Sequence, residues 1–303
     1  MSTAVLLLAH GTPDSVEDIP EYLRNVTSGR AIPDSVITEI QHRYGLIGRS
    51  PLTAITLRQG ELLAESLSVP VYVGMRNWKP YIAEALRQMR LAGIQKTIAI
   101  CLAPQNSRTS VGLYRKAIEH NGGDIDIDFV ESWHAHPLLI SAFAARLENA
   151  LATHGKQTPV IFTAHSVPAR TITDGDPYER QARETGNLVA AKAKLPRSQY
   201  KFAFQSQGMS GGPWIGPTVE ETMRELREQG QDRVLIQPIG FLCDHVEILY
   251  DIDIAFRELG SEIGLQVLRT ESLNESPLLI AALAALVSER LSVQAAASNL
   301  GEF

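Results

Sequence analysis

The sequence predicts an α/β fold built from two similar domains with parallel sheets, and three observations support it. A length of 303 residues is long for one compact core and suits two domains of about 150 residues each. Short apolar runs alternate with segments of helical periodicity along nearly the whole length, which is typical of α/β proteins. A short motif occurs twice, about half a chain apart.

The predicted strands are short and apolar throughout, rather than alternating in polarity. This pattern is expected of parallel strands that helices cover on both faces. These strands are Val5–Ala9, Val69–Gly74, Thr97–Leu102, Ile125–Val130, Val160–Thr163, Lys201–Gln205, Val234–Pro238 and Gly264–Leu268.

The predicted helices carry start and stop signals. Asp14 and Ser15 are expected to cap a first helix, whose apolar stripe extends from Val16 to Val26 and which ends at Gly29. Further helical spacing is found in Thr53–Leu67, Pro80–Leu91, Pro137–Thr153, Pro177–Lys194, Thr218–Glu228 and Pro277–Leu291.

The repeated motif relates the two halves of the chain. Leu6–Pro13 and Ile161–Pro168 each consist of an apolar strand, then Ala-His, a small residue, and a proline three positions after the histidine. The repeat predicts domains 1–152 and 153–303 that face each other across a cleft. Each domain would present its histidine, His10 or His165, past the carboxyl end of its first strand, where open α/β sheets bind ligands.

Composition and charge argue against some classes of partner and indicate a cellular location. The net charge of −6, with no Lys/Arg-rich run, argues against nucleic acid or an anionic membrane surface as a partner. The start of the chain lacks the basic segment of a signal peptide, and the apolar run Ala4–Ala9 is too short to cross a bilayer. We therefore expect a cytoplasmic protein with no integral membrane segment.

The two cysteines, Cys101 and Cys243, are expected to be buried reduced thiols. No C-x-x-C motif is present, so no iron–sulfur cluster is expected.

A second candidate site lies in Gly240–Asp251, after the strand Val234–Pro238. Asp244 is expected to cap a helix that carries Glu247 in its first turn. Asp251 and Glu258 would share a helical face with Glu247. A solvated acidic face is the alternative explanation, as a backbone-bonded structural histidine is for His165.

A histidine with carboxylates and no thiolates suits Fe(II), Zn(II) or Co(II). The same groups suit proton transfer, since neutral imidazole can accept a proton that a nearby carboxylate stabilises. The pair His134 and His136 could also bind metal, but its place in a turn before a helix favours a structural role.

In their order along the chain, these segments resemble the ferrochelatase family through about residue 290. The matching segments are Ala9–Pro13, Tyr44 with Ser50–Leu52, Leu102–Pro104, Glu131–Trp133, Ala164–Pro168, Gly175–Tyr178, Gln205–Ser206, Pro213–Pro217 and Asp244–Asp251. The resemblance implies two Rossmann-like domains around a porphyrin cleft. It also implies that His165 and Glu247 bind the metal and remove the pyrrole protons, with Fe(II) as substrate and no required cofactor.

The region Val16–Pro51 resembles the compact enzymes that act on coproporphyrin III. By that likeness the substrate contacts are His10, Arg43, Tyr44, Ser50 and Tyr114, and the metal ligands are His165, Glu247, His10 and Asp251. Porphyrin and haem are the implied partners, with a possible downstream haem-processing enzyme.

The chain departs from the compact pattern at three positions. His10 replaces a tyrosine, Thr27 replaces a propionate-contacting arginine, and Ala255 replaces a third carboxylate for which Asp253 or Glu258 would have to compensate. The alternatives are a protoporphyrin IX ferrochelatase, a related cobalt or tetrapyrrole chelatase, and a haem-binding carrier without catalysis.

Overall fold

The computed structural model describes residues 2–208 and 212–300, and the side chains as far as residue 293. Within this part of the chain, eight strands form two parallel four-stranded sheets, so the predicted fold class is confirmed. The first sheet has the order β2-β1-β3-β4, with β1 Thr3–Ala9, β2 Val71–Met75, β3 Lys96–Cys101 and β4 Asp126–Val130. The second has the order β6-β5-β7-β8, with β5 Val160–His165, β6 Tyr200–Gln205, β7 Arg233–Pro238 and β8 Gln266–Arg269.

The two halves repeat one topology, as the sequence motif predicted. β1 and β5 occupy the same position in their sheets, each with the next strand of the chain on one side and the third on the other. The central part of β1, Ala4–Leu8, is fully buried, which explains why its residues are apolar on both faces.

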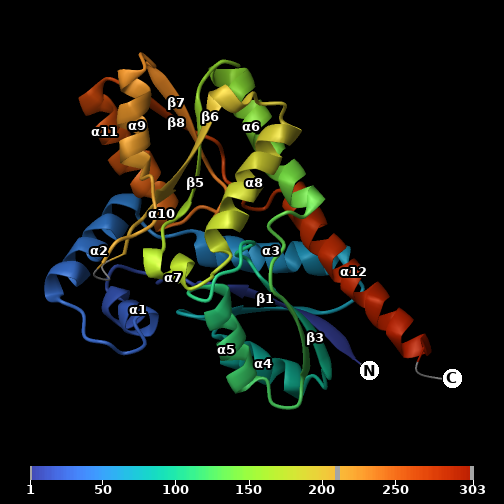
Figure 1. Ribbon diagram of the computed structural model, residues 1–303. Coiled ribbons are helices and arrows are strands. Elements are labelled where there is room, and N and C mark those ends of the chain that lie inside the picture. The colour runs from blue at the N-terminus through green and yellow to red at the C-terminus, as the bar shows by residue number, and fades with distance from the viewer. Residues whose placement is uncertain (1, 209–211, 301–303) are drawn as a thin grey trace.

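Helices surround both sheets, and Figure 1 shows the two lobes one above the other. The N-terminal half contributes α1 Ile19–Val26, α2 Asp34–Ile47, α3 Leu52–Ser66, α4 Ile82–Leu91, α5 Val111–Asn121 and α6 Pro137–His154. The C-terminal half contributes α7 Ala169–Thr173, α8 Tyr178–Lys192, α9 Val219–Glu228, α10 Val246–Leu249, the π-helix η2 Asp251–Phe256, α11 Arg257–Ile263 and α12 Pro277–Leu300.

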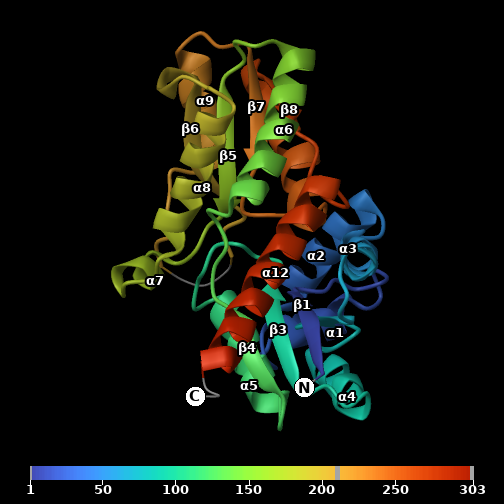
Figure 2. The same ribbon diagram turned by 90° about the vertical axis from the view of Figure 1, so that its right-hand side faces the viewer.

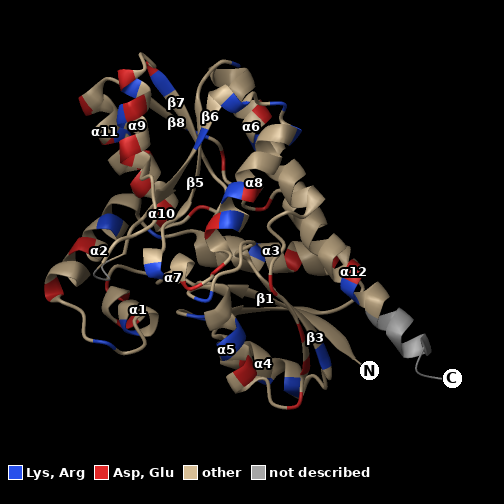
Figure 3. Ribbon diagram, viewed as in Figure 1, with Lys and Arg blue, Asp and Glu red and all other residues tan. Residues whose placement is uncertain are grey.

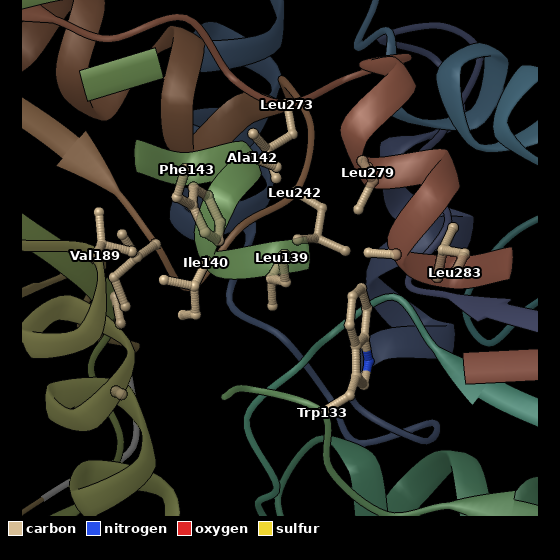
Figure 4. Close-up of a cluster of buried hydrophobic side chains, with 14 of the residues drawn as sticks. Trp133, Leu139, Ile140, Ala142, Phe143, Val189, Leu242, Leu273, Leu279 and Leu283 are labelled. Carbon is tan, nitrogen blue, oxygen red and sulfur yellow. The ribbon is translucent and has the colours of Figure 1, made fainter. Parts of the chain in front are cut away.

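The halves share one hydrophobic core. Its buried side chains come from both sheets and from α6, α8 and α12. Figure 4 shows side chains of the three helices that belong to this core. α12 packs on both α6 and α3, and Figures 1 and 2 show it running from the upper lobe along the lower one. The division into domains 1–152 and 153–303 stays a prediction, and its boundary falls inside the last turn of α6.

The start of α1 differs from the prediction. The helix begins at Ile19 with Asp18 at the N-cap position, because Pro20 suits the first turn. The backbone N–H and hydroxyl of Ser15 donate to the Asp18 carboxylate and form a turn before the helix. Asp14 accepts a hydrogen bond from the Trp78 indole instead, at 3.0 Å.

The prediction for the two cysteines is confirmed. Both cysteines are free and buried. His134 bonds to Ser132 and Glu184, and His136 caps α6, so this pair is structural. Lys and Arg positions are scattered among Asp and Glu positions over both lobes in the view of Figure 3. Across the described residues, no helix has the length and apolar character needed to span a membrane.

Candidate active site

His165 is the last residue of β5, the strand that lies between β6 and β7. The Nδ1 atom of His165 contacts the carbonyl oxygen of Ser166, and the Tyr178 hydroxyl donates to the His165 carbonyl at 2.9 Å. Because Nδ1–H donates to a carbonyl, the neutral imidazole carries its lone pair on Nε2. This atom lies 3.7 Å from Oε2 of Glu247.

Glu247 is held at the start of α10, directly after the loop that follows β7. His245, not Asp244, is the N-cap residue: its Nδ1 accepts a hydrogen bond from the Glu247 backbone N–H at 3.1 Å. The Gln205 amide donates to the Glu247 carbonyl at 2.8 Å. The prediction of Asp244 as the cap is therefore wrong, because its carboxylate is bound to Arg269.

The His165–Glu247 pair has the electrostatics of a site for a cation or proton. Oε2 of Glu247 is buried and has no hydrogen-bond partner among the described residues. Two acceptor atoms that face each other at 3.7 Å repel, and a shared proton or a divalent cation removes that repulsion. The structure therefore brings together the two residues on which the sequence prediction depends.

His165 and Glu247 form one wall of the candidate site. Asp251 lies on this wall, at the first position of η2, and is 8% exposed. The Ser206 hydroxyl donates to Oδ2 of Asp251, and Nη1 of Arg43 lies 3.8 Å from Oδ1. Burial raises the pKa of Asp251 to about 6, and the nearby charge of Glu247 adds to the effect. A carboxyl group with this pKa can be protonated or ionised near neutral pH.

The predicted row of three carboxylates is wrong at its outer end. Glu258 lies in α11 and is exposed, whereas Asp251 is buried. The π-helix between them has a wider turn than an α-helix and changes the direction in which later side chains point. Asp253 does not compensate for Ala255 either, because it is paired with Arg269 and Arg257.

The opposite wall comes from the N-terminal half and is formed by buried polar side chains. His10 follows β1, and its Nε2 lies 2.9 Å from the Tyr22 hydroxyl, while the Asn77 amide lies 3.2 Å from Nδ1. Burial lowers the pKa of His10 to about 3, and the charge of Arg76 adds to this effect. His10 is therefore a neutral imidazole whose ring nitrogens both have neighbours.

Three of the predicted substrate contacts, Tyr44, Ser50 and Tyr114, are almost fully buried. The Ser50 hydroxyl and Nε of Arg76 are buried without a hydrogen-bond partner among the described residues, whereas the Tyr44 hydroxyl interacts with Tyr22. Buried groups without a partner are rare in native proteins, and each needs an explanation such as a role in binding a ligand. The guanidinium of Arg76 lies 5.7 Å from the centre of the Tyr114 ring, so Arg76 and Tyr114 lie together.

Arg43 connects the two walls. It projects from α2, binds Glu39 at 2.8 Å and lies over the Tyr250 ring at 4.9 Å, in addition to its contact with Asp251. α2 and α10 pack against each other, as Figure 1 shows. A pocket of about 390 Å³ opens at this junction; its lining includes Arg43, Gln205, Ser206, Glu220, Tyr250, Asp251 and Ala255.

A second pocket, of about 340 Å³, lies between α5 and the residues before α8 and contains none of the predicted site residues. Its two arginines, Arg108 and Arg115, are paired with Asp174 and Glu131.

The four predicted metal ligands do not form one cluster. Among the described residues, no three His, Cys, Asp or Glu side chains lie close enough together to hold a metal ion. His165 and Glu247 form a pair, Asp251 lies one turn further along the same segment, and His10 is on the opposite wall. The Thr27 hydroxyl donates to the carbonyl of Leu23, and the lost propionate contact at this position stays a prediction.

Tyr22, Arg76, Asn77 and Ser206 are site residues that the sequence prediction missed or gave no role. Arg76 and Asn77 directly follow β2, so the rule that selected His10 and His165 would also have found them. Tyr22 is on α1 and carries no comparable signal, because a tyrosine at an apolar helical position is usually part of the core.

Comparison with known proteins supports the family resemblance found in the sequence. A sequence model of the ferrochelatase family matches residues 2–291. A ferrochelatase from Acidobacterium capsulatum is 57% identical over 95% of this chain and 94% of its own length. A coproporphyrin III ferrochelatase from Anoxybacillus flavithermus is 34% identical over 95% of this chain and 96% of its own length.

Among solved structures, SirB from Bacillus subtilis with Fe3+ is similar in fold. Its TM-score is 0.62 at 14% identity, over 100% of this chain and 99% of that one. The sequence matches, the repeated sheets and the His165–Glu247 pair all support the same family. The chain therefore belongs to the ferrochelatase family, the lyases that insert iron into a porphyrin for haem biosynthesis.

Proposed function

We propose that the chain is a coproporphyrin III ferrochelatase in which His165 and Glu247 carry out metal insertion on one face of the macrocycle. The observation that carries the proposal is the facing pair itself, with Nε2 and Oε2 3.7 Å apart and Oε2 buried without a partner among the described residues.

The reaction requires one Fe(II) ion to replace two pyrrole N–H protons, so the total charge is conserved. The Nε2 lone pair of His165 can accept a proton from the porphyrin, and the Glu247 carboxylate stabilises the imidazolium that results. The pair must then release both protons before the next turnover. Iron is the substrate here, and the proposed reaction uses no resident cofactor.

Asp251 extends this wall toward the pocket at the junction of the two halves. Its carboxylate can transfer a divalent cation to the His165–Glu247 pair or carry protons away from it, because a pKa of about 6 allows both charge states near neutral pH. We propose that Arg43, which lies beside Asp251, limits the negative charge of this path when no cation is present.

His10 faces the other side of the macrocycle in this proposal. Its ring is neutral, so it is chemically competent to bind product iron, but Nε2 must first lose its contact with the Tyr22 hydroxyl. The haem spectrum of a His10→Ala variant tests this assignment. A changed axial signature would support ligation, and an unchanged one would exclude it.

Two observations support coproporphyrin III as the substrate. Several relatives at 33–34% identity, each matched over at least 95% of this chain, are named coproporphyrin III ferrochelatases. The wall formed by Tyr44, Ser50 and Arg76 also offers buried donors, and the Ser50 hydroxyl and Nε of Arg76 have no partner among the described residues. Coproporphyrin III carries a propionate at each position where protoporphyrin IX has a vinyl group, and such donors suit carboxylates. The product would still carry those propionates, so an enzyme that converts them would act next.

The test is anaerobic Fe(II) insertion by the purified protein, followed by the loss of free-porphyrin fluorescence. Faster turnover of coproporphyrin III than of protoporphyrin IX is expected, and the reverse preference would overturn the substrate assignment. A His165→Ala variant should fold and bind porphyrin without inserting iron, whereas retained insertion would exclude this site. Porphyrin binding without turnover by the unmodified protein would favour a carrier.

A further inference from the structure

Arg269 joins the two ends of the segment that carries Glu247 and Asp251. It is the last residue of β8, and its Nε and Nη2 donate to the two oxygens of Asp253 at 3.0 and 2.8 Å. Its Nη1 donates to Oδ1 of Asp244 at 3.2 Å. The three side chains are 14–20% exposed, so water competes weakly for these bonds.

Asp244 is fixed from several directions. Its carboxylate accepts hydrogen bonds from the Ser272 hydroxyl at 2.6 Å and from the Asn274 amide at 2.9 Å. Its backbone N–H donates to the Asn274 side chain, also at 2.9 Å. The connection between β8 and α12 therefore holds the start of the segment, directly before the cap residue His245.

The segment between Asp244 and Asp253 has little stability of its own. α10 is one turn long, and η2 is a π-helix, a form that rarely persists without tertiary contacts. Glu247 and Asp251 lie inside this segment, between the two carboxylates that Arg269 binds. The directions of both side chains therefore depend on how firmly the ends are held.

We propose that Arg269 is a positioning residue for iron insertion, which sets the Glu247 and Asp251 carboxylates relative to His165 by binding Asp244 and Asp253 together. The proposal rests on the roles proposed above for Glu247 and Asp251. A lysine cannot replace this arginine, because only the planar guanidinium can bind one carboxylate through two nitrogens and reach a second carboxylate with the third.

The same anchor reaches the N-terminal half of the chain. The amide of Gln59 on α3 donates to the backbone carbonyl of Asn274 at 2.6 Å, and Gln59 is only 1% exposed. Arg269 is thus linked through Asp244 and Asn274 to a buried residue of the N-terminal half. Loss of the guanidinium should loosen the segment of the C-terminal wall without removing any group that contacts porphyrin.

The test compares Arg269→Lys with a control, Arg290→Lys. Arg290 on α12 binds Asp128 at 3.0 Å and likewise joins distant elements, but away from the site. For Arg269→Lys, kcat/KM for Fe(II) should fall about 10- to 100-fold, as for other residues that orient metal-binding groups. Porphyrin affinity, from fluorescence titration of metal-free porphyrin, should change less than about threefold. The control should match the unmodified enzyme in both measurements.

Unchanged kcat/KM for Fe(II) in Arg269→Lys would overturn the proposal, as would an equal loss of porphyrin affinity. If Arg269→Lys does not fold, Asp253→Asn provides the second test, because Arg269 then keeps Asp244 and loses only its paired contact. Asp253→Asn should show the same selective loss for Fe(II), and normal iron kinetics would refute the proposal.

Glu247→Gln measured in parallel separates this inference from the proposed function. An inactive Glu247→Gln beside a fully active Arg269→Lys would overturn only the role of Arg269. An active Glu247→Gln would overturn the proposed site together with the inference.

Discussion

Replacing Asp251 by asparagine should stabilise the protein at neutral pH. Asp251 is 8% exposed, and its pKa is raised from 3.8 to about 6, mainly by burial. A difference of this size between the folded and unfolded chains corresponds to about 3 kcal/mol, the free energy lost when the carboxyl group is ionised in the folded protein. Asparagine has a similar shape and no charge, so it removes this cost.

The sign follows from proton binding. The folded chain holds the Asp251 proton more tightly than the unfolded chain, so stability falls as pH rises from about 4 to about 6. Below pH 4 both states are protonated, and the group costs less than about 1 kcal/mol. The advantage of Asp251→Asn should therefore reach about 2–3 kcal/mol at pH 7.5 and nearly vanish at pH 4.

Urea unfolding of metal-free protein in the presence of a chelator, at both pH values, measures this difference. The midpoint should rise at pH 7.5 with an unchanged slope. Asp253→Asn is the matched control on the same helix: it should destabilise at pH 7.5, because it leaves Arg269 and Arg257 without that partner. An Asp251→Asn variant that is no more stable at pH 7.5, or equally more stable at both pH values, would refute the reasoning.

Three further predictions follow from burial and packing. Gly240→Ala should destabilise the protein by about 1–3 kcal/mol, because the new Cβ would lie 2.8 Å from Cβ of Ala164 in β5. It should also slow iron insertion in steady-state assays. Unchanged stability would show that β5 can shift freely. His10→Phe should reduce the loss of stability between pH 6.5 and pH 4, because the folded protein keeps His10 neutral while the unfolded chain protonates it; acid unfolding curves that coincide would contradict this. Burial raises the pKa of Cys243 to about 12 and that of Cys101 further, so both thiols should react with a thiol reagent only on unfolding, and rapid labelling of the native protein would argue against their burial.

The strand pattern could be predicted from the sequence because parallel strands covered on both faces are apolar at every position. All eight predicted strands occur among the described residues, each within a few positions of its predicted ends. The helices α2, α5 and α7 were missed. α2 buries only Tyr44, so it has almost no apolar stripe to detect.

The chemistry of the site could also be predicted, since the repeated motif marks strand ends, where this class of fold binds ligands. His165 and Glu247 are 82 positions apart, and the repeat with the acidic motif placed both in the site. The capping residue and the third carboxylate could not be predicted. His245 caps α10 because Asp244 is bound by Arg269. Glu258 lies at the surface because the π-helix η2 changes the direction of the side chains that follow it.

The sequence by itself determined the fold class, the family and the two residues that face each other, because each depends on local periodicity or on a motif at a strand end. Only the tertiary structure decided which polar groups are buried without partners among the described residues, how Arg43 meets Asp251, and how Arg269 holds the segment between its two carboxylates. Those properties depend on distances between residues far apart in the chain and on the water that packing removes, and neither is encoded in local spacing.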